Sequence, residues 1–203
     1  SMYEIDYNEV YEELKNIQSG KPSSFKKKRK KSKTPALDHY GRDLTELARR
    51  SDEFAQRKTK LIGLSIDSIH SHLAWRENLK QIMDVEINYP IIADLDMKVA
   101  QAYGMIQPGA SDTQAVRATF VIEPEGVLRA MVYYPMTNGR SIDEFVRLVT
   151  ALQTSDANAC ATPENWQPGE KVIVPPPATV DAAEKRESEG YEYTDWYFSR
   201  KSL

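Results

Sequence analysis

The sequence of 203 residues contains one cysteine and no long apolar stretch. With Cys160 alone, no internal disulfide can form, and a reducing cytoplasm is the expected location. No apolar run approaches the roughly 20 residues that a membrane-spanning helix requires. Residues 1–20 are acidic and lack the apolar centre of a signal peptide. We therefore expect a cytoplasmic protein without a membrane-spanning helix.

Motifs for nucleotides and metals are also missing. The phosphate-binding pattern G-x-x-x-x-G-K-[ST] does not occur. His70 and His72 are two positions apart, so on a helix their side chains would diverge. Asp94 and Asp96 are explained by capping of a helix that starts near Met97. We predict neither a cofactor nor a bound metal.

Positive charge is scarce outside the first quarter of the chain. Residues 1–51 carry 12 Lys/Arg against 8 Asp/Glu, whereas the whole chain has a net charge of −3. The block Lys26–Lys33, K-K-K-R-K-K-S-K, repels itself and is predicted to be a disordered, solvated linker. Binding to nucleic acid or to an acidic surface is the alternative. Because no aromatic residues are interleaved with the block, nucleic acid is not the expected partner.

The segments before residue 52 differ in character. Apolar residues at helical spacing predict an N-terminal helix within residues 1–17, and residues 18–34 are the predicted basic linker. The apolar residues of the N-terminal helix are Tyr7, Val10, Tyr11, Leu14 and Ile17. A further helix is predicted from Leu44 to Arg57, and its apolar face comprises Leu44, Leu47, Ala48 and Phe54.

From residue 60 onward, strand and helix patterns alternate in the order β-α-β-α-β-β-α, which predicts an α/β layer fold with a mixed sheet. The expected strands are Lys60–Asp67, Tyr89–Ala93 and a hairpin over Val116–Tyr134; the expected helices are a segment capped by Ser68, Met97–Tyr103, and Ser141–Leu152. The helix after Ser68 is expected to bury Ile69, Leu73, Leu79, Ile82 and Met83 on one face.

The hairpin carries one unexpected cation. Strand-forming residues flank the turn signal E-P-E-G, and the first strand is largely apolar. Arg117 lies at the start of this strand. Its side chain either extends to solvent at the strand end or faces an anion in a cleft, and the sequence leaves both readings open.

The C-terminal tail is rich in proline and aromatic residues. Thr162–Gly169 and Val172–Pro177 are predicted to be extended. The aromatic cluster Tyr191–Phe198 needs a surface that covers it. We therefore expect an arm that wraps around its own core or around a partner subunit.

One stretch resembles a different family from the remainder. T-P-A-L-D-H-Y-G-R-D-L-T-E-L-A-R, within about residues 35–51, resembles the segment of Clp-type AAA+ unfoldases that joins the N-terminal domain to the first ATPase module. In that family the chain continues as D-P-V-I-G-R, whereas this chain continues as S-D-E-F-A-Q-R. Since the phosphate-binding motif is absent, this resemblance implies no ATPase activity.

Residues 52–198 resemble the peroxiredoxins, specifically the one-cysteine class with a long C-terminal arm. The blocks that carry the resemblance include L-I-G-L-S-I-D-S-I-H-S-H-L-A-W, V-R-A-T-F-V-I, Y-Y-P-M-T-N-G-R-S-I-D-E and A-T-P-E-N-W-Q-P-G-E. The resemblance implies a thioredoxin-like core over residues 52–153 and a dimerisation arm over residues 154–203. It also implies a homodimer or ring of dimers, and an antioxidant activity in which a thiol reduces hydroperoxides.

The same resemblance assigns two candidate site residues. Arg117 matches the arginine beside the peroxidatic thiolate, and Arg140 in N-G-R-S matches a second supporting arginine. A guanidinium near a thiol lowers the thiol pKa. The alternative for Arg140 is a salt bridge at the entry of a helix.

The peroxidatic cysteine itself is not found. The family motif P-x-x-x-[ST]-x-x-C is absent, and its register places the cysteine near Tyr40, whose phenol cannot replace a thiolate. Cys160 has no basic residue nearby before Lys171 and is expected to be a spectator thiol. Residues 18–51 also contain no buried apolar strand, so the N-terminal strand and the peroxidatic loop of the family are expected to be replaced.

Three interpretations follow. The first is a peroxiredoxin-family protein with impaired or absent peroxidase activity. The second is a binding or adaptor module that its N-terminal segment tethers to a partner. The third is a chimera in which two unrelated segments join at about Arg50–Asp52.

Overall fold

The structure is a computed structural model that describes residues 43–106, 115–135 and 137–203. The chain divides into two compact units, Ser1–Thr34 and Pro35–Leu203, and every described residue belongs to the second. The predicted N-terminal helix and the basic linker therefore lie outside the described residues. Among the described helices, none is both long and apolar enough to cross a membrane.

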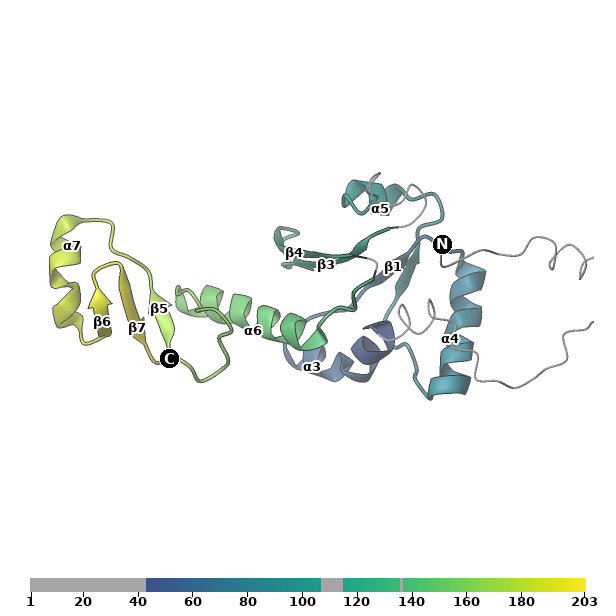
Figure 1. The fold of residues 1–203 in the computed structure, drawn as a ribbon, viewed down its shortest axis with the longest axis horizontal. Helices are drawn as coiled ribbons and strands as arrows, with labels where there is room; N and C mark the ends of the chain where they lie inside the picture. Colours follow the sequence, from purple (N-terminus) through teal and green to yellow (C-terminus); the bar gives the residue numbers. More distant parts are fainter. Residues whose placement is uncertain (1–42, 107–114, 136) are drawn as a thin grey trace, which may run out of the picture. The chain divides into compact units, whose positions relative to one another are not determined.

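The order of helices and strands agrees with the predicted β-α-β-α-β-β-α order and gives a thioredoxin-like α/β core (Figure 1). Residues 43–49 are helical. The following elements are α3 (Ser51–Gln56), β1 (Gly63–Ser65), α4 (Ile69–Met83), β2 (Ile91–Ala93), α5 (Lys98–Ala102), β3 (Arg117–Ile122), β4 (Leu128–Tyr134) and α6 (Ile142–Asn158).

The strands of the core form two pairs. β1 and β2 are parallel, with Gly63 opposite Ile91, and β3 and β4 are antiparallel, with Arg117 opposite Tyr134. Both kinds of pairing expected of a mixed sheet are present, but within the described residues the two pairs are not hydrogen-bonded to each other. That the N-terminal strand and the peroxidatic loop of the family are replaced stays a prediction.

One apolar cluster joins the two strand pairs. It is centred on Ala100, Met105 and Val116, and side chains from both β1 and β3 pack against it. These side chains include Leu64 and Phe120. Apolar burial therefore holds the two pairs against a common layer although their backbones are not paired.

The hairpin is confirmed. Its turn closes through a hydrogen bond from Glu123 N to Val127 O, and Gly126 has a φ of +86°, which favours glycine. The Arg129 guanidinium contacts the carboxylates of Glu123 at 2.8 Å and Asp156 at 2.7 Å. This ion triple connects β4 to α6.

Helix α6 begins where the sequence predicts. The Ser141 hydroxyl caps it by accepting a hydrogen bond from Glu144 N. Of the side chains expected on its apolar face, Ile142, Phe145, Val146 and Val149 are buried, whereas Leu152 is only partly buried. Phe145 and Val146 pack with Phe54 of α3 and with β4. The helix continues to Asn158, beyond the predicted end at Leu152.

The predicted buried face of α4 is wrong in part. Ser68 caps the helix as expected, but Ile69, Leu73 and Ile82 are exposed. The core instead receives Leu79 and His72, with Trp75 and Met83 partly buried. These four side chains follow one another at intervals of three or four residues and form a single stripe, whereas the predicted set combined residues from different faces.

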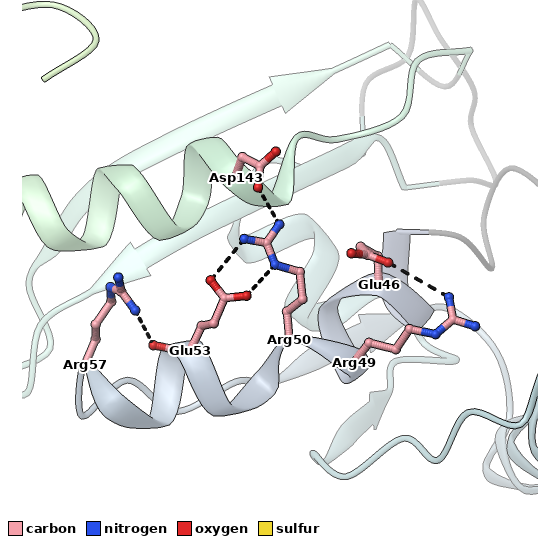
Figure 2. A network of polar contacts seen from close by, with 6 residues as sticks. All are labelled: Glu46, Arg49, Arg50, Glu53, Arg57 and Asp143. Carbon is pink, nitrogen blue, oxygen red and sulfur yellow. Dashed lines mark hydrogen bonds and ion pairs between the residues drawn. The ribbon is translucent and has the colours of Figure 1, made fainter. Parts of the chain in front are cut away.

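The helical stretch 43–49 continues into α3 through a polar network around Arg50. The Arg50 guanidinium lies 2.6 Å from Glu53 and 2.6 Å from Asp143 at the start of α6, as Figure 2 shows. The hydrogen bond from Arg50 lowers the pKa of the Glu53 carboxyl group. Leu47 and Phe54, on either side of this point, pack in the same apolar cluster. Residues 50–52 therefore do not form a boundary between separate folding units.

The C-terminal arm has more regular structure than the sequence predicts. It contains β5 (Val172–Val174), α7 (Val180–Lys185), the 3-10 helix η1 (Arg186–Glu189), β6 (Glu192–Asp195) and β7 (Phe198–Lys201). The three strands form an antiparallel sheet in the order β5-β7-β6. The aromatic cluster Tyr191–Phe198, which was expected to need a covering surface, lies largely within the β6–β7 hairpin of the arm itself.

The arm is fastened to the end of α6 by a small core. Trp166 is almost fully buried and packs with Ala151, Cys160 and Val172. The Trp166 indole N–H donates a hydrogen bond to Glu170 O at 3.1 Å. This cluster ties the first part of the arm to the last turns of the helix.

Candidate active site

Arg117 does not extend to solvent. Its side chain is 3 % exposed, and its Nη1 donates a hydrogen bond to Asn138 O at 2.7 Å. The same nitrogen lies 3.5 Å from Asp43 Oδ2, whose side chain is 9 % exposed. Of the two readings that the sequence left open, the structure supports the one in which Arg117 faces an anion, and that anion is a carboxylate of the chain.

Arg140 approaches the same carboxylate oxygen. Its Nε and its backbone N are both 3.2 Å from Asp43 Oδ2. Its Nη1 donates to Ala118 O on β3 at 3.1 Å. Because Arg140 directly precedes the cap of α6, this geometry is the helix-entry salt bridge that was the alternative to a supporting catalytic role.

Asp43 is the residue that sequence reasoning missed. It lies in the stretch attributed to a Clp-type segment, three residues after Tyr40, and a lone aspartate there matches no local pattern. Gly139 lies close to this carboxylate, since a Cβ at that position would be 3.3 Å from Asp43 Oδ1. The glycine of N-G-R-S thus lets the carboxylate approach the backbone that carries Arg140.

Buried Asp43 and Arg117 and the partly buried Arg140 form a cluster with an excess of positive charge. Two guanidinium groups share one carboxylate, and burial removes water that would otherwise screen them. Such a group can stabilise a further anion, or it can act as a purely structural ion cluster. Its own residues offer neither a nucleophile nor a proton acceptor apart from the Asp43 carboxylate.

A pocket of about 460 Å³ opens beside the cluster. Asp43 and Arg140 line it together with Arg49, Arg50 and Ser141. Further carboxylates on its wall come from Glu46 and Asp143, so that cations and anions are balanced. Charged side chains of both signs therefore line the pocket, together with the apolar Met83 and Ile142.

Tyr89 lies near the cluster but cannot act as a base. Burial raises the pKa of Tyr89 to about 12, although the Arg140 cation opposes this rise. Its hydroxyl donates a hydrogen bond to Leu44 O at 3.0 Å. The phenol therefore stays protonated at neutral pH and supports the helix that carries Asp43.

Cys160 lies at the opposite end of α6 from the arginine cluster. It follows the helix C-cap Ala159, and its Sγ is 3.9 Å from Thr154 O. Helix α6 has 17 residues. At a rise of about 1.5 Å per residue, its two ends lie about 25 Å apart. Carbonyl groups at a helix C-terminus do not stabilise an anion. The thiol is buried in the cluster around Trp166, away from both arginines.

The remaining polar candidates have structural partners. His72 Nε2 lies 2.7 Å from Ser65 Oγ, while His70 is exposed. Asp94 accepts hydrogen bonds from Val99 N at 3.0 Å and Ala100 N at 2.6 Å, which confirms its capping role. Over residues 43–106, 115–135 and 137–203, no three His, Cys, Asp or Glu side chains are arranged to hold a metal ion.

The α/β core, its parallel and antiparallel strand pairs and its C-terminal arm define a thioredoxin-like protein with an appended domain. The AhpC/TSA family matches residues 39–131, and the C-terminal domain of 1-Cys peroxiredoxin matches residues 151–190. A peroxiredoxin of Aquifex aeolicus is 50 % identical over 171 residues, which cover 79 % of this chain and 77 % of the relative. A peroxiredoxin of Methanosarcina mazei is 48 % identical over 159 residues, covering 74 % and 73 %.

Solved structures agree with these sequences. The yeast mitochondrial 1-Cys peroxiredoxin has a TM-score of 0.72 and 32 % identity, over 84 % of this chain and 82 % of the other. A cysteine mutant of Peroxiredoxin 6 from Arenicola marina has a TM-score of 0.69 and 29 % identity, over 84 % and 80 %. The chain belongs to the peroxiredoxin family.

The family match also covers part of the stretch that resembles the Clp-type segment. It begins at residue 39, so it includes Tyr40 and Asp43. None of the matches reported above is to an unfoldase. The resemblance to Clp-type proteins thus rests on the sequence of about 16 residues alone. The buried contacts of Asp43 connect this stretch to the peroxiredoxin core.

Proposed function

We propose that this chain is a peroxiredoxin-family protein that does not reduce hydroperoxides with its own cysteine. The observation that carries the proposal is the position of Cys160. Peroxiredoxin chemistry needs a thiolate beside a group that stabilises negative charge. The only thiol of the chain lies at one end of α6, and the two arginines lie at the other.

In this proposal, Arg117 and Arg140 are the remaining half of a peroxide site. They would stabilise charge on a substrate oxygen if a thiolate were present, which is the role that the family resemblance assigns to them. Here the Asp43 carboxylate takes the place of an external anion, and the cluster holds β3 and the start of α6 together. The chain would then serve as a non-catalytic binding or scaffolding domain.

Hydroperoxide consumption tests this proposal directly. Purified protein, hydrogen peroxide and excess dithiothreitol are mixed, and peroxide loss is followed against a buffer control. The expected rate equals the rate without protein, and Cys160→Ser leaves it unchanged. Turnover that Cys160→Ser abolishes would show that the chain is a peroxidase that uses Cys160.

Self-association is part of the proposal. A homodimer or ring of dimers through residues 154–203 is supported by the match of residues 151–190 to a domain of 1-Cys peroxiredoxins and by exposed Trp196 and Tyr197 on the arm. Light scattering over a hundredfold range of protein concentration is expected to give at least twice the monomer mass. A monomer mass at every concentration would refute the dimer.

The chimera interpretation gains no support from the contacts near residue 50. The Arg50 network joins the helical stretch 43–49 to α3 and α6, and Asp43 binds β3 and the loop before α6. These contacts fit the proposal that Asp43 and the core belong to one folding unit.

A further inference from the structure

The loop between β4 and α6 contains two residues whose chemistry can rearrange the backbone. Asn138 precedes Gly139, and it is the one asparagine of the sequence that a glycine follows. Both residues are exposed. A glycine has no Cβ, so its backbone nitrogen can approach the preceding side chain without steric hindrance. The pair is therefore suited to attack of the Gly139 nitrogen on the side-chain amide of Asn138.

The hydrogen bonds of this loop leave the attacking group unengaged. The backbone N–H of Asn138 donates to Pro135 O at 3.0 Å. Among the described residues, the N–H of Gly139 has no hydrogen-bond acceptor. No hydrogen bond has to break before the Gly139 nitrogen approaches Cγ of Asn138. Because the two residues are adjacent in the chain, the reacting groups are held in proximity.

Two hydrogen-bond donors act on the two carbonyl groups of Asn138. The Thr137 hydroxyl donates to the side-chain Oδ1 at 2.8 Å, which makes the carbon under attack more electrophilic. The Arg117 guanidinium donates to the backbone O at 2.7 Å. When the Gly139 N–H loses its proton, this oxygen shares the negative charge, because the peptide group is conjugated. A fixed cation beside the oxygen therefore stabilises the anionic nucleophile.

We propose that Asn138 is a site of spontaneous deamidation, which Thr137 promotes and Arg117 directs to an isoaspartyl product. Water takes the Gly139 proton, a bond forms between the Gly139 nitrogen and Cγ of Asn138, and Nδ2 leaves as ammonia with a proton from water. Water then adds to the backbone carbonyl carbon of the cyclic imide, because Arg117 polarises that carbonyl. The bond from this carbon to the Gly139 nitrogen breaks, and the main chain then runs through Cβ and Cγ.

The direction of ring opening decides which group faces Arg117. In the isoaspartyl product, the former backbone carbonyl of Asn138 is a free carboxylate, and one of its oxygens is the atom that accepts from Arg117 Nη1. Two guanidinium groups share the single carboxylate of Asp43, so a second carboxylate would balance the charge of the cluster. Opening at Cγ gives an ordinary aspartate instead, whose carboxylate replaces an exposed amide. The inference does not depend on whether the chain reduces hydroperoxides.

The test follows the full chain during incubation for several weeks at neutral pH. Peptide mapping by mass spectrometry measures the loss of each side-chain amide, and electron-transfer fragmentation distinguishes isoaspartate from aspartate. The exposed Asn158 at the end of α6 is the internal control, because the N–H of the next residue, Ala159, is engaged in a hydrogen bond to Ser155 O. Asn138 is expected to deamidate at least about tenfold faster than Asn158, since only its reacting groups are free to meet.

Two substitutions at Thr137 test the contact to the side-chain carbonyl without altering the core. Thr137→Val removes the hydroxyl and keeps the branched shape, whereas Thr137→Ser keeps the hydroxyl and is the matched control. Thr137→Val is expected to slow deamidation of Asn138 about threefold to tenfold, as the loss of one neutral hydrogen bond does. Thr137→Ser is expected to leave the rate nearly unchanged. Because Thr137 is exposed, both variants should melt at the temperature of the unmodified chain.

The role of Arg117 is measured by the ratio of isoaspartate to aspartate at position 138. In the folded chain this ratio is expected to be at least about threefold higher than in the same chain unfolded in urea, where Arg117 no longer contacts the backbone O of Asn138. Arg117→Gln is expected to give the lower ratio under native conditions. If Arg117→Gln is unfolded, the comparison of the folded and the urea-treated chain decides the question alone.

Three results would overturn the proposal. Deamidation of Asn138 that is no faster than that of Asn158 would show that the loop does not permit the attack. Equal rates in Thr137→Val and Thr137→Ser would remove the hydroxyl from the reaction. A ratio of isoaspartate to aspartate that is the same in the folded and the unfolded chain would show that Arg117 does not direct the opening of the ring.

Discussion

Arg117 and Asp43 form a buried ion pair, with Nη1 and Oδ2 3.5 Å apart, and they come from segments more than 70 positions apart in the sequence. Arg140 contacts the same carboxylate, so the pair is part of a cluster in which one anion serves two cations. The stability of the core therefore depends on a residue for which local sequence gives no signal.

Asp43→Asn is expected to destabilise the protein by about 3–5 kcal/mol, because removing one partner leaves buried charge uncompensated. Urea unfolding followed by circular dichroism measures the change. Asp52→Asn, at an exposed site on α3, is the control and is expected to change stability by less than about 0.5 kcal/mol. Equal stability of Asp43→Asn and the unmodified chain would show that the cluster contributes nothing to the fold.

The contribution of Arg50 is expected to depend on pH. Its hydrogen bond lowers the pKa of Glu53 from an ordinary value of 4.5. A lowered native pKa gives stability that is present above the unfolded value and is lost as pH falls through the native value. The stability difference between the unmodified chain and Arg50→Ala should thus be constant near neutral pH and should shrink below about pH 4.5. A difference that grows on acidification would contradict the assigned pair.

Trp166→Ala is expected to loosen the arm. Removing the indole from the cluster that Trp166 forms with Cys160 and Val172 should lower the free energy of unfolding by about 3–5 kcal/mol, as truncation of a buried aromatic side chain does. Limited proteolysis should then cut between residues 160 and 180 faster than in the unmodified chain. Trp196→Ala, on an exposed indole, is the control and should leave the rate of cleavage near its original value.

The assignment of Arg140 as a supporting arginine is tested by supplying the missing thiol. The family register places the peroxidatic cysteine near Tyr40, so Tyr40→Cys is combined with Cys160→Ser. The introduced thiol is expected to react with iodoacetamide with a pH midpoint below the ordinary value of about 8.5, because cations favour the thiolate. Adding Arg140→Gln should raise this midpoint again. A midpoint that is insensitive to Arg140→Gln would leave Arg140 with a structural role only.

The sequence predicted those parts of the fold that depend on local pattern. Ser68 and Ser141 precede clear helical periodicity, and both cap the helices that they were expected to cap. The strand-turn-strand pattern around Gly126 likewise determines a hairpin without help from distant residues. Periodicity also located α4, but it did not select the buried face, because His72 takes a core position that an apolar pattern does not mark.

Features that depend on distant contacts were not predicted. The arm sheet requires β5 to pair with β7 across almost thirty positions, and its short strands have little pattern of their own. The partner of Arg117 and Arg140 could not be found for the same reason, since Asp43 approaches them only after the core has assembled. Arg117 itself could be singled out from the sequence, because a permanent cation in an apolar strand is costly to bury unless it is paired.

The burial of Cys160 has a practical consequence. Because it is the only thiol of the chain and lies between the end of α6 and the arm, alkylating reagents reach it only when this junction opens. The rate of thiol labelling in the unmodified protein thus reports how often the junction between α6 and the arm opens. A binding partner that closes the junction would lower the labelling rate of Cys160, and one that displaces the arm would raise it. No engineered probe is needed for this measurement.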